Sequence, residues 1–333
     1  MKNEEKTEKI PAKEVQRQSN FELLRIFAML LIIAHHLGLS ILRTTCEFPI
    51  VANLYITRAL TIGGKLGVNI FVMISGYFLS VSTFKPRKFL ALAGEVVFYG
   101  AGIFFAFGTA GVAKFTFENF LLSFDYGFVL YYLIIYITSP FINILVKNLT
   151  RNLHIALIVI MLIFQVVVTV EESLAFCSTL SSYLTVYVIA AYFRFYNDKI
   201  LNDKRVVIPL ALGLLLFITA MYAFANVKLW AQSDLLCIAC SAFIFLWFKN
   251  VKIKNNRIIN AVSKTTFGVY LIHDNGLMRN FLWKTLLRCE FHLTLNVFAV
   301  FAVVAIAGVF AVCSAIEWVR SNYKSFYMPL LSE

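Results

Sequence analysis

Residues 21–42, FELLRIFAMLLIIAHHLGLSIL, are the most informative part of this chain about its fold. It is long and apolar enough to cross a bilayer as a helix, yet it contains Arg25 and His36, eleven positions apart. On a helix that spacing places both side chains on one stripe, about 16 Å apart along the axis. Ionisable groups inside a membrane rarely face lipid. We therefore expect a membrane-spanning helix in which His36 belongs to a functional site.

The composition indicates a membrane protein. Of the 333 residues, 60% are hydrophobic and only 14% are charged, and the mean hydropathy is +0.78, a balance unlike that of soluble domains. The net charge of +12 would suit a nucleic-acid partner only if the cations formed one face interleaved with aromatic residues. They lie instead in short segments between apolar spans, so we expect no nucleic-acid partner and attribute the charge to membrane topology.

Ten apolar spans, each of about 17–25 residues as a bilayer requires, can be drawn along the chain. Of the Lys and Arg residues, 22 fall on the side that holds the N-terminus and 8 on the other side. The positive-inside rule then places both termini in the cytoplasm. The expected fold is an all-α polytopic integral membrane protein with about ten transmembrane helices and both termini cytoplasmic. The spans are predicted at residues 22–42, 66–84, 89–109, 127–146, 153–170, 176–193, 206–225, 233–248, 259–278 and 293–316.

One transmembrane domain, residues 21–318, is predicted between two cytoplasmic tails. Residues 1–20 are polar and charged and lack the apolar core and cleavage site of a signal peptide, so we expect a disordered tail there. Residues 319–333 form the second predicted tail. The sequence shows no internal repeat.

No metal site is predicted, because the chain has no Cys or His spacing typical of one. The adjacent rings of His35 and His36 point about 100° apart on a helix and cannot chelate one ion as an i, i+4 pair does. Cys237 and Cys240 form a CxxC, but within an apolar span, where close helix packing is the simpler interpretation.

Two stretches that follow the first predicted helix along the chain also contain polar or charged groups. GGKLGVNIFVMISGYFLS, residues 63–80, contains Ser75, which fits either small-residue helix packing or a site. After it, Lys85, Arg87 and Lys88 share a short turn. That turn is either a positive-inside anchor or a clamp for an anionic cytosolic ligand.

The segment SKTTFGVYLIHDN, residues 263–275, gathers ionisable groups at one end of the ninth predicted span. Tyr270 lies one helical turn from Asp274, and His273 lies beside it. A single His near an interface is often a packing residue, whereas this cluster favours a site. We predict that these three side chains and Ser75 converge with His36 at one end of a water-accessible channel through the membrane.

Taken together, the chain resembles the membrane acyltransferase 3 family, bacterial O-acyltransferases that modify cell-surface and exported glycans. The likeness is carried by Arg25-X10-His36, by GVNIFVMISGYFLS at 67–80, by the basic turn after it and by TTFGVYLIHDN at 265–275. It extends over roughly residues 20–320. The resemblance implies a multi-pass protein of the bacterial plasma membrane.

The resemblance also implies a reaction. His36 is expected to be the catalytic histidine and Arg25 its companion, and histidine is the usual base for activating a hydroxyl. The implied donor is acetyl-CoA or another acyl-CoA, a co-substrate rather than a resident cofactor. The family's pair of arginines three apart is met here by Lys85 and Lys88, with Arg87 between them, as the implied acyl-CoA site. Lysine supplies the charge without the bidentate fork of arginine.

The implied acceptor is a hydroxyl of a cell-surface or lipid-linked polysaccharide, and several alternatives stay open. The acceptor could be a small molecule or peptidoglycan. A secondary transporter would also hold His, Asp and Arg at membrane depth, although the inverted repeats expected of one are not seen. A non-catalytic scaffold would tolerate replacement of His36. The sequence leaves undecided the oligomeric state and whether His36 acts as a base or carries the acyl group.

Overall fold

A computed structural model describes residues 17–44, 49–170, 175–227 and 234–327 of the chain. The described residues are helical or irregular and contain no strand, which confirms the predicted all-α class. Most of the predicted tail at residues 1–20 lies outside the described residues. The helices, in chain order, are α1 (Ser19–Leu42), α2 (Val51–Leu79), α3 (Pro86–Thr109), α4 (Phe117–Leu122), α5 (Val129–Asn148), α6 (Arg151–Val170), α7 (Ala175–Phe195), α8 (Lys204–Ala225), α9 (Leu235–Lys249), α10 (Arg257–Ser263), α11 (Thr266–His273), α12 (Gly276–Asn280), the π-helix η2 (Phe281–Leu286), the 3-10 helix η3 (Cys289–Thr294) and α13 (Phe298–Tyr327).

Within the described residues, six helices are long and apolar enough to cross a membrane: α1, α2, α3, α5, α8 and α13. α9 is apolar but shorter. Length and composition therefore support a multi-pass membrane protein. The count of ten spans and the cytoplasmic placement of both termini stay predictions.

Two predicted spans have different bounds in the structure. The second span was expected at 66–84, but α2 begins at Val51 and ends at Leu79. Hydropathy missed its first turns because they carry polar residues, whose side chains are buried and bonded: Asn53 donates to the carbonyl of Leu293 at 2.8 Å. The last span was expected to end at residue 316, whereas α13 continues to Tyr327.

The ninth predicted span, 259–278, is not one helix but three short ones, α10, α11 and α12. The last break has a local cause. The side chain of Asn275 accepts hydrogen bonds from the backbone N–H groups of Leu277 and Met278, as an N-cap does. A new helix therefore starts where the apolar pattern alone predicted continuation.

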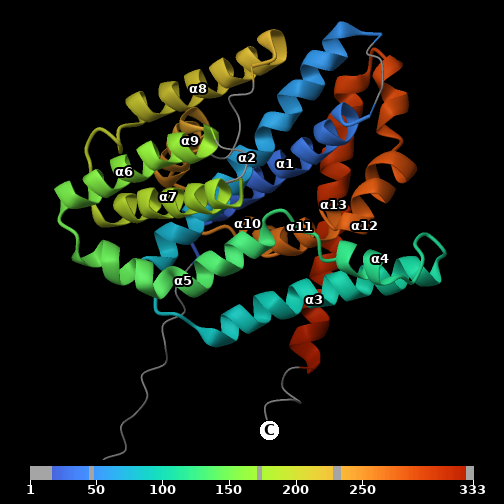
Figure 1. The fold of residues 1–333 in the computed structure, drawn as a ribbon, viewed down its shortest axis with the longest axis horizontal. Coiled ribbons are helices and arrows are strands. Elements are labelled where there is room, and N and C mark those ends of the chain that lie inside the picture. The colour runs from blue at the N-terminus through green and yellow to red at the C-terminus, as the bar shows by residue number, and fades with distance from the viewer. Residues whose placement is uncertain (1–16, 45–48, 171–174, 228–233, 328–333) are drawn as a thin grey trace, which may run out of the picture.

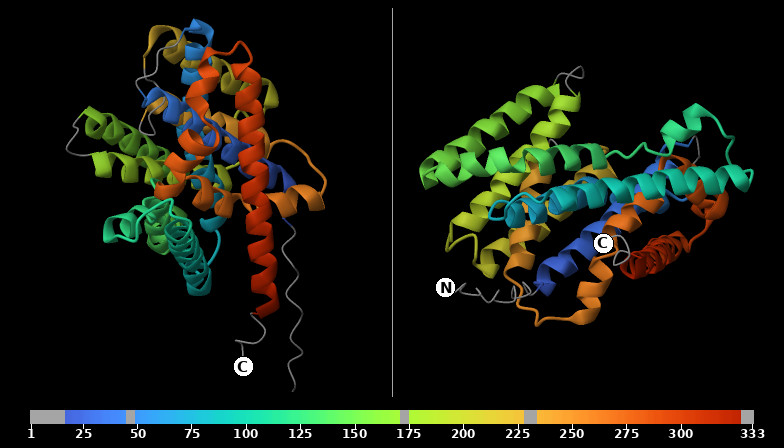
Figure 2. Two further views of the ribbon diagram at one scale, coloured as in Figure 1. Left: turned by 90° about the vertical axis from the view of Figure 1, so that its right-hand side faces the viewer. Right: turned by 90° about the horizontal axis from the view of Figure 1, so that it is seen from below.

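α1 and α2 form the centre of the molecule and pack against each other over most of α1. Helices α5 to α9 lie on one side of this pair and α11 to α13 on the other, with α3 along one edge (Figure 1). Two further views show α13 as a long straight helix beside the bundle (Figure 2). Small residues permit the close contact: a Cβ added at Gly67 of α2 would lie less than 3.0 Å from the carbonyl oxygen of Ala28 in α1.

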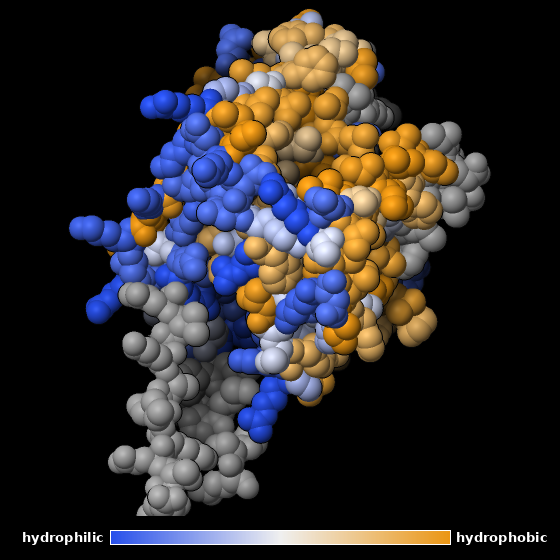
Figure 3. Space-filling view, turned by 90° about the vertical axis from the view of Figure 1, so that its left-hand side faces the viewer, coloured by the Kyte–Doolittle hydropathy of each residue, from blue (hydrophilic) through white to orange (hydrophobic). Residues whose placement is uncertain are grey.

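The outer surface carries many large apolar side chains. Phe141 is 73% exposed, Leu216 69% and Val303 67%. One face of the molecule shows hydrophobic residues over most of its area and hydrophilic residues gathered toward one edge (Figure 3). Apolar exposure on this scale marks surfaces that contact another apolar phase, as the lipid-facing sides of membrane helices do.

Candidate active site

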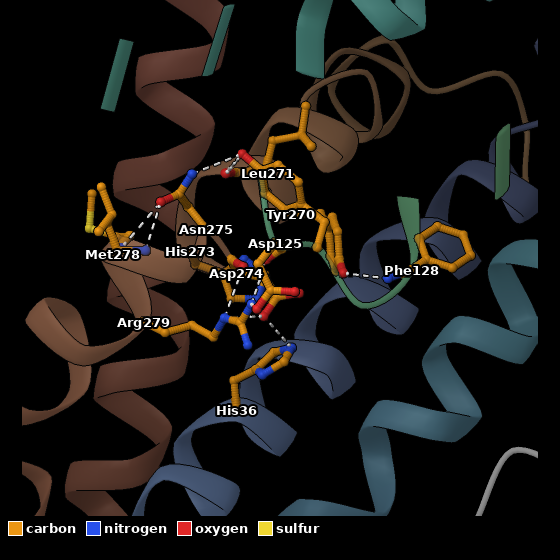
Figure 4. A network of polar contacts seen from close by, with 12 residues as sticks. His36, Asp125, Phe128, Tyr270, Leu271, His273, Asp274, Asn275, Met278 and Arg279 are labelled. Carbon is orange, nitrogen blue, oxygen red and sulfur yellow. Dashed lines mark hydrogen bonds and ion pairs between the residues drawn. The ribbon is translucent and has the colours of Figure 1, made fainter. Parts of the chain in front are cut away.

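His36 and Asp274 lie together at the centre of the site. His36 comes from the last turns of α1, and Asp274 is the C-cap of α11. Nε2 of His36 lies 3.3 Å from Oδ1 of Asp274, as Figure 4 shows. The ring of His273 packs edge-on against the ring of His36, with 5.4 Å between the centroids. The structure thus brings together three residues that the sequence predicted to converge.

The break between α11 and α12 positions Asp274. Its backbone N–H still bonds to the carbonyl of Tyr270 and closes the last turn of α11. The next residue, Asn275, caps α12 and donates through its Nδ2 to the carbonyl of Ser123 and to the hydroxyl of Tyr126. Because both helix ends are fixed in this way, the Asp274 carboxylate is held in the gap, facing His36.

Arg279 is a second partner of Asp274. Its Nε lies 3.3 Å from Oδ1 of Asp274, and its other end pairs with Asp125, with 2.8 Å between the Arg279 nitrogen and Oδ2. Asp274 is only 2% exposed, and a buried carboxylate needs a charged or hydrogen-bonding partner. The sequence analysis missed both Arg279 and Asp125, because each is a single charge in a loop or short helix without a motif around it.

Tyr270 lies on the other side of Asp274. Its hydroxyl interacts with the Asp274 carboxylate and accepts a hydrogen bond from the backbone N–H of Phe128 at 3.2 Å. Its ring packs against His273, 5.9 Å away. Tyr270, Asp274 and His36 therefore form a continuous row, which we call the central row.

The central row, whose three residues are labelled in Figure 4, lies between two cavities. The first cavity, about 380 Å³, is lined by Tyr270 together with residues from the N-terminal half of α1, among them Arg25. The second cavity, about 200 Å³, is lined by His36 and Arg279. None of the described residues that line one cavity lines the other. Molecules that reach the row from opposite directions would meet different residues of it.

Two predicted acceptor-side residues lie apart from His36. Ser75 lines the first cavity and hydrogen-bonds to the hydroxyl of Tyr132 at 3.2 Å, and Tyr270 also lines the first cavity. The predicted cavity shared with His36 therefore does not include them. The cause is the central row itself, which fills the space in which a single cavity was expected.

Arg25 is not in contact with His36. It pairs one turn away with Glu22, at 3.1 Å, and lines the first cavity. The two predicted partners thus share α1 but lie in the walls of different cavities. If Arg25 takes part in the reaction, it acts on the substrate and not on His36.

Of the three basic residues after α2, one lines the first cavity. All three side chains are exposed, but only Lys88 is among the lining residues. The other cations in the wall of this cavity are Arg17, Arg25, Lys264 and Arg320. The predicted three-residue clamp is therefore reduced to Lys88, with cations from distant parts of the chain beside it.

Arg320 belongs to an ion-pair network that the sequence analysis missed. It pairs with Glu317 at 2.7 Å and with Glu95 at 3.0 Å, and Glu317 accepts a hydrogen bond from the hydroxyl of Tyr99 at 2.6 Å. Because the last span was expected to end at residue 316, Glu317 was placed beyond it and Arg320 in the predicted tail, away from Glu95 and Tyr99 in the third predicted span. Glu317, an acidic residue on an otherwise apolar helix, was the feature of the sequence that could have indicated this network.

Among the described residues, no group of three or more His, Cys, Asp or Glu side chains could hold a metal ion. The groups available for chemistry at the site are therefore an imidazole, a buried carboxylate and a phenol, between two separate cavities that both carry more cations than carboxylates.

Comparison with known proteins gives one match. The sequence model for the acyltransferase domain of the membrane acyltransferase 3 family matches residues 18–318, which include every residue of the central row. No curated protein and no solved structure matches the chain.

Proposed function

Because the chain belongs to the membrane acyltransferase 3 family, we propose that it moves an acyl group from cytosolic acyl-CoA to a hydroxyl of a cell-surface or lipid-linked polysaccharide. An acetyl group is the proposed cargo, and the bacterial plasma membrane the proposed location. The observation that carries the proposal is the His36–Asp274 pair, placed between two separate cavities. A transferase whose two substrates come from opposite sides needs this arrangement.

The proposed chemistry begins at His36. Its Nε2 faces Asp274, so Nδ1 is the nitrogen that takes the proton of the acceptor hydroxyl. As the hydroxyl oxygen bonds to the thioester carbon, the carbon–sulfur bond breaks, and the released thiolate receives the proton from His36. The Asp274 carboxylate stabilises the positive imidazolium formed in between, a role that a nearby fixed carboxylate serves in other hydroxyl-activating sites.

The first cavity is the proposed donor site. Arg25, Lys88 and Lys264 line it, and clustered Lys and Arg side chains bind phosphate oxygens through charge-assisted hydrogen bonds. The proposed orientation turns this cavity, and the N-terminal end of α1, toward the cytoplasm, where acyl-CoA is available. The second cavity then opens toward the acceptor.

A direct test compares neighbouring histidines. His36→Ala should lower acyl transfer by roughly 10²–10⁴-fold, the usual contribution of a general base. His35→Ala is the matched control, because the His35 ring is buried against α2, where it contacts the carbonyl of Thr61. Transfer from labelled acetyl-CoA would be followed in membrane vesicles by mass spectrometry of the glycans.

The outcomes separate the alternatives. Equal loss in both variants, with normal amounts of protein in the membrane, would contradict the role of His36. Full transfer by His36→Ala would do the same. Label recovered on peptidoglycan or on a small molecule would keep the enzyme class and replace the acceptor.

A further inference from the structure

The second cavity has an unusual charge. Arg43, Arg279 and Lys284 line it, and Asp125 is the carboxylate among its lining residues. Asp125 is already paired with Arg279. Arg279 also pairs with Asp274, so three cations face two carboxylates at this cavity, and Arg43 and Lys284 are the cations that form no ion pair among the described residues.

These cations come from separate parts of the chain. Arg43 follows the end of α1, whereas Arg279 is in α12 and Lys284 in η2. They belong to the set of 8 Lys and Arg residues that the sequence places opposite the termini, against 22 on the other side. The positive-inside rule depletes that side of Lys and Arg. Three of so few cations around one small cavity therefore require an explanation other than topology.

A buried tryptophan gives an independent indication of a ligand. Trp283 lines the second cavity and is only 2% exposed. Its indole N–H is buried and has no hydrogen-bond partner among the described residues. Buried donors in folded proteins nearly always have a partner, so an acceptor atom of a ligand in the cavity would supply the one that this N–H lacks.

We propose that the second cavity binds an acceptor that carries a negative charge, a carboxylate or a phosphate, close to the hydroxyl that is acylated. Arg43 and Lys284 meet the anion, the indole N–H of Trp283 donates to the acceptor, and His36 faces the hydroxyl. The inference rests on the proposed function and names the substrate class of that site. It excludes a neutral polysaccharide as the preferred acceptor.

The test uses the full chain in membrane vesicles from cells that make it, supplied with labelled acetyl-CoA. Glycans are then separated by anion exchange into acidic and neutral fractions. Label is expected in the acidic fraction. The double variant Arg43→Gln/Lys284→Gln should raise the KM for acidic glycan about tenfold, since each rim cation contributes on the order of 0.7 kcal/mol. The KM for acetyl-CoA should not change.

Lys114→Gln is the matched control. It removes an exposed cation of the same predicted side that does not line the cavity. A second arm repeats the assay in phosphatidylcholine vesicles with and without phosphatidylglycerol. If the double variant loses activity only when phosphatidylglycerol is present, the cations serve a lipid headgroup and the inference is overturned.

The remaining outcomes distinguish the two proposals. Label confined to neutral glycan, and lost in His36→Ala, would overturn the anionic acceptor while the acyltransferase stands. Label that persists in His36→Ala, or no label in either fraction, would overturn the proposed function and the inference with it.

Discussion

Nε2 of His36 lies 3.3 Å from Oδ1 of Asp274, and this pair joins the first helix to a helix break near the other end of the chain. Asp274 also holds Arg279 at 3.3 Å and interacts with Tyr270. One buried carboxylate thus fixes the imidazole, a cation of the second cavity and a phenol of the first cavity.

Asp274→Asn should lower kcat for acyl transfer by roughly 10- to 10³-fold, because a neutral amide cannot stabilise the His36 imidazolium. The KM for acetyl-CoA should stay the same, since the donor is proposed to bind in the first cavity. Initial rates at several acetyl-CoA concentrations give both values. A change in KM alone would assign Asp274 to donor binding.

Tyr270→Phe removes the hydroxyl that connects the backbone of Phe128 to Asp274. Since the ring stays, packing against His273 should be preserved and the melting temperature nearly unchanged. We expect acyl transfer to fall about tenfold, the effect of one lost hydrogen bond to a charged group. Thermal unfolding in detergent and the rate are measured on one preparation. A variant with unchanged transfer would remove Tyr270 from the mechanism.

Lys88→Gln should raise the KM for acetyl-CoA severalfold, because Lys88 lines the first cavity. The wild-type KM should also rise with salt, which screens a charged ligand, and the variant should respond less. Arg87→Gln, an exposed neighbour that does not line the cavity, is the control and should leave the KM unchanged. Equal effects of the two changes would favour a topological role for the basic turn.

Gly67→Ala should destabilise the protein by about 1–3 kcal/mol through overpacking. The added methyl group would meet the carbonyl oxygen of Ala28 and the side chain of Ile32 at less than 3.0 Å. Gly94→Ala in α3 is the matched control, since nothing lies within 4 Å of the position of its new Cβ. Melting temperatures in detergent compare the two. A stable Gly67→Ala variant would contradict the close α1–α2 contact.

Composition and local sequence pattern predict those features of this protein that depend on its surroundings, here the lipid bilayer. An apolar run of membrane length predicts a helix because its backbone must satisfy its own hydrogen bonds in lipid, and α1, α3, α5 and α8 follow within a few residues. The placement of His36 as a site residue also came from sequence, since a polar group at that depth is costly. Both predictions depend on the energy cost of placing one segment or one side chain in lipid, and not on contacts between distant residues.

Hydropathy failed where polar groups are buried by partners far away in the chain. Asn53 begins the core part of α2 because Leu293 accepts its hydrogen bond. Glu317 and Arg320 extend α13 beyond its predicted end, and Glu95 from α3 completes their network. A hydropathy scale assigns each residue one fixed cost of burial, so it leaves out the free energy that a hydrogen-bond or ion-pair partner contributes.

The amino-acid pattern was enough to predict an all-helical membrane protein in which His36, Tyr270, His273 and Asp274 are unusual residues for their depth. How these four side chains are arranged follows from the packing of the helices. The Asn275 cap breaks the helix and aims Asp274 at His36, and the resulting row divides one expected cavity into two. Contacts between residues so distant in the chain depend on how helices pack, and no local pattern encodes that geometry.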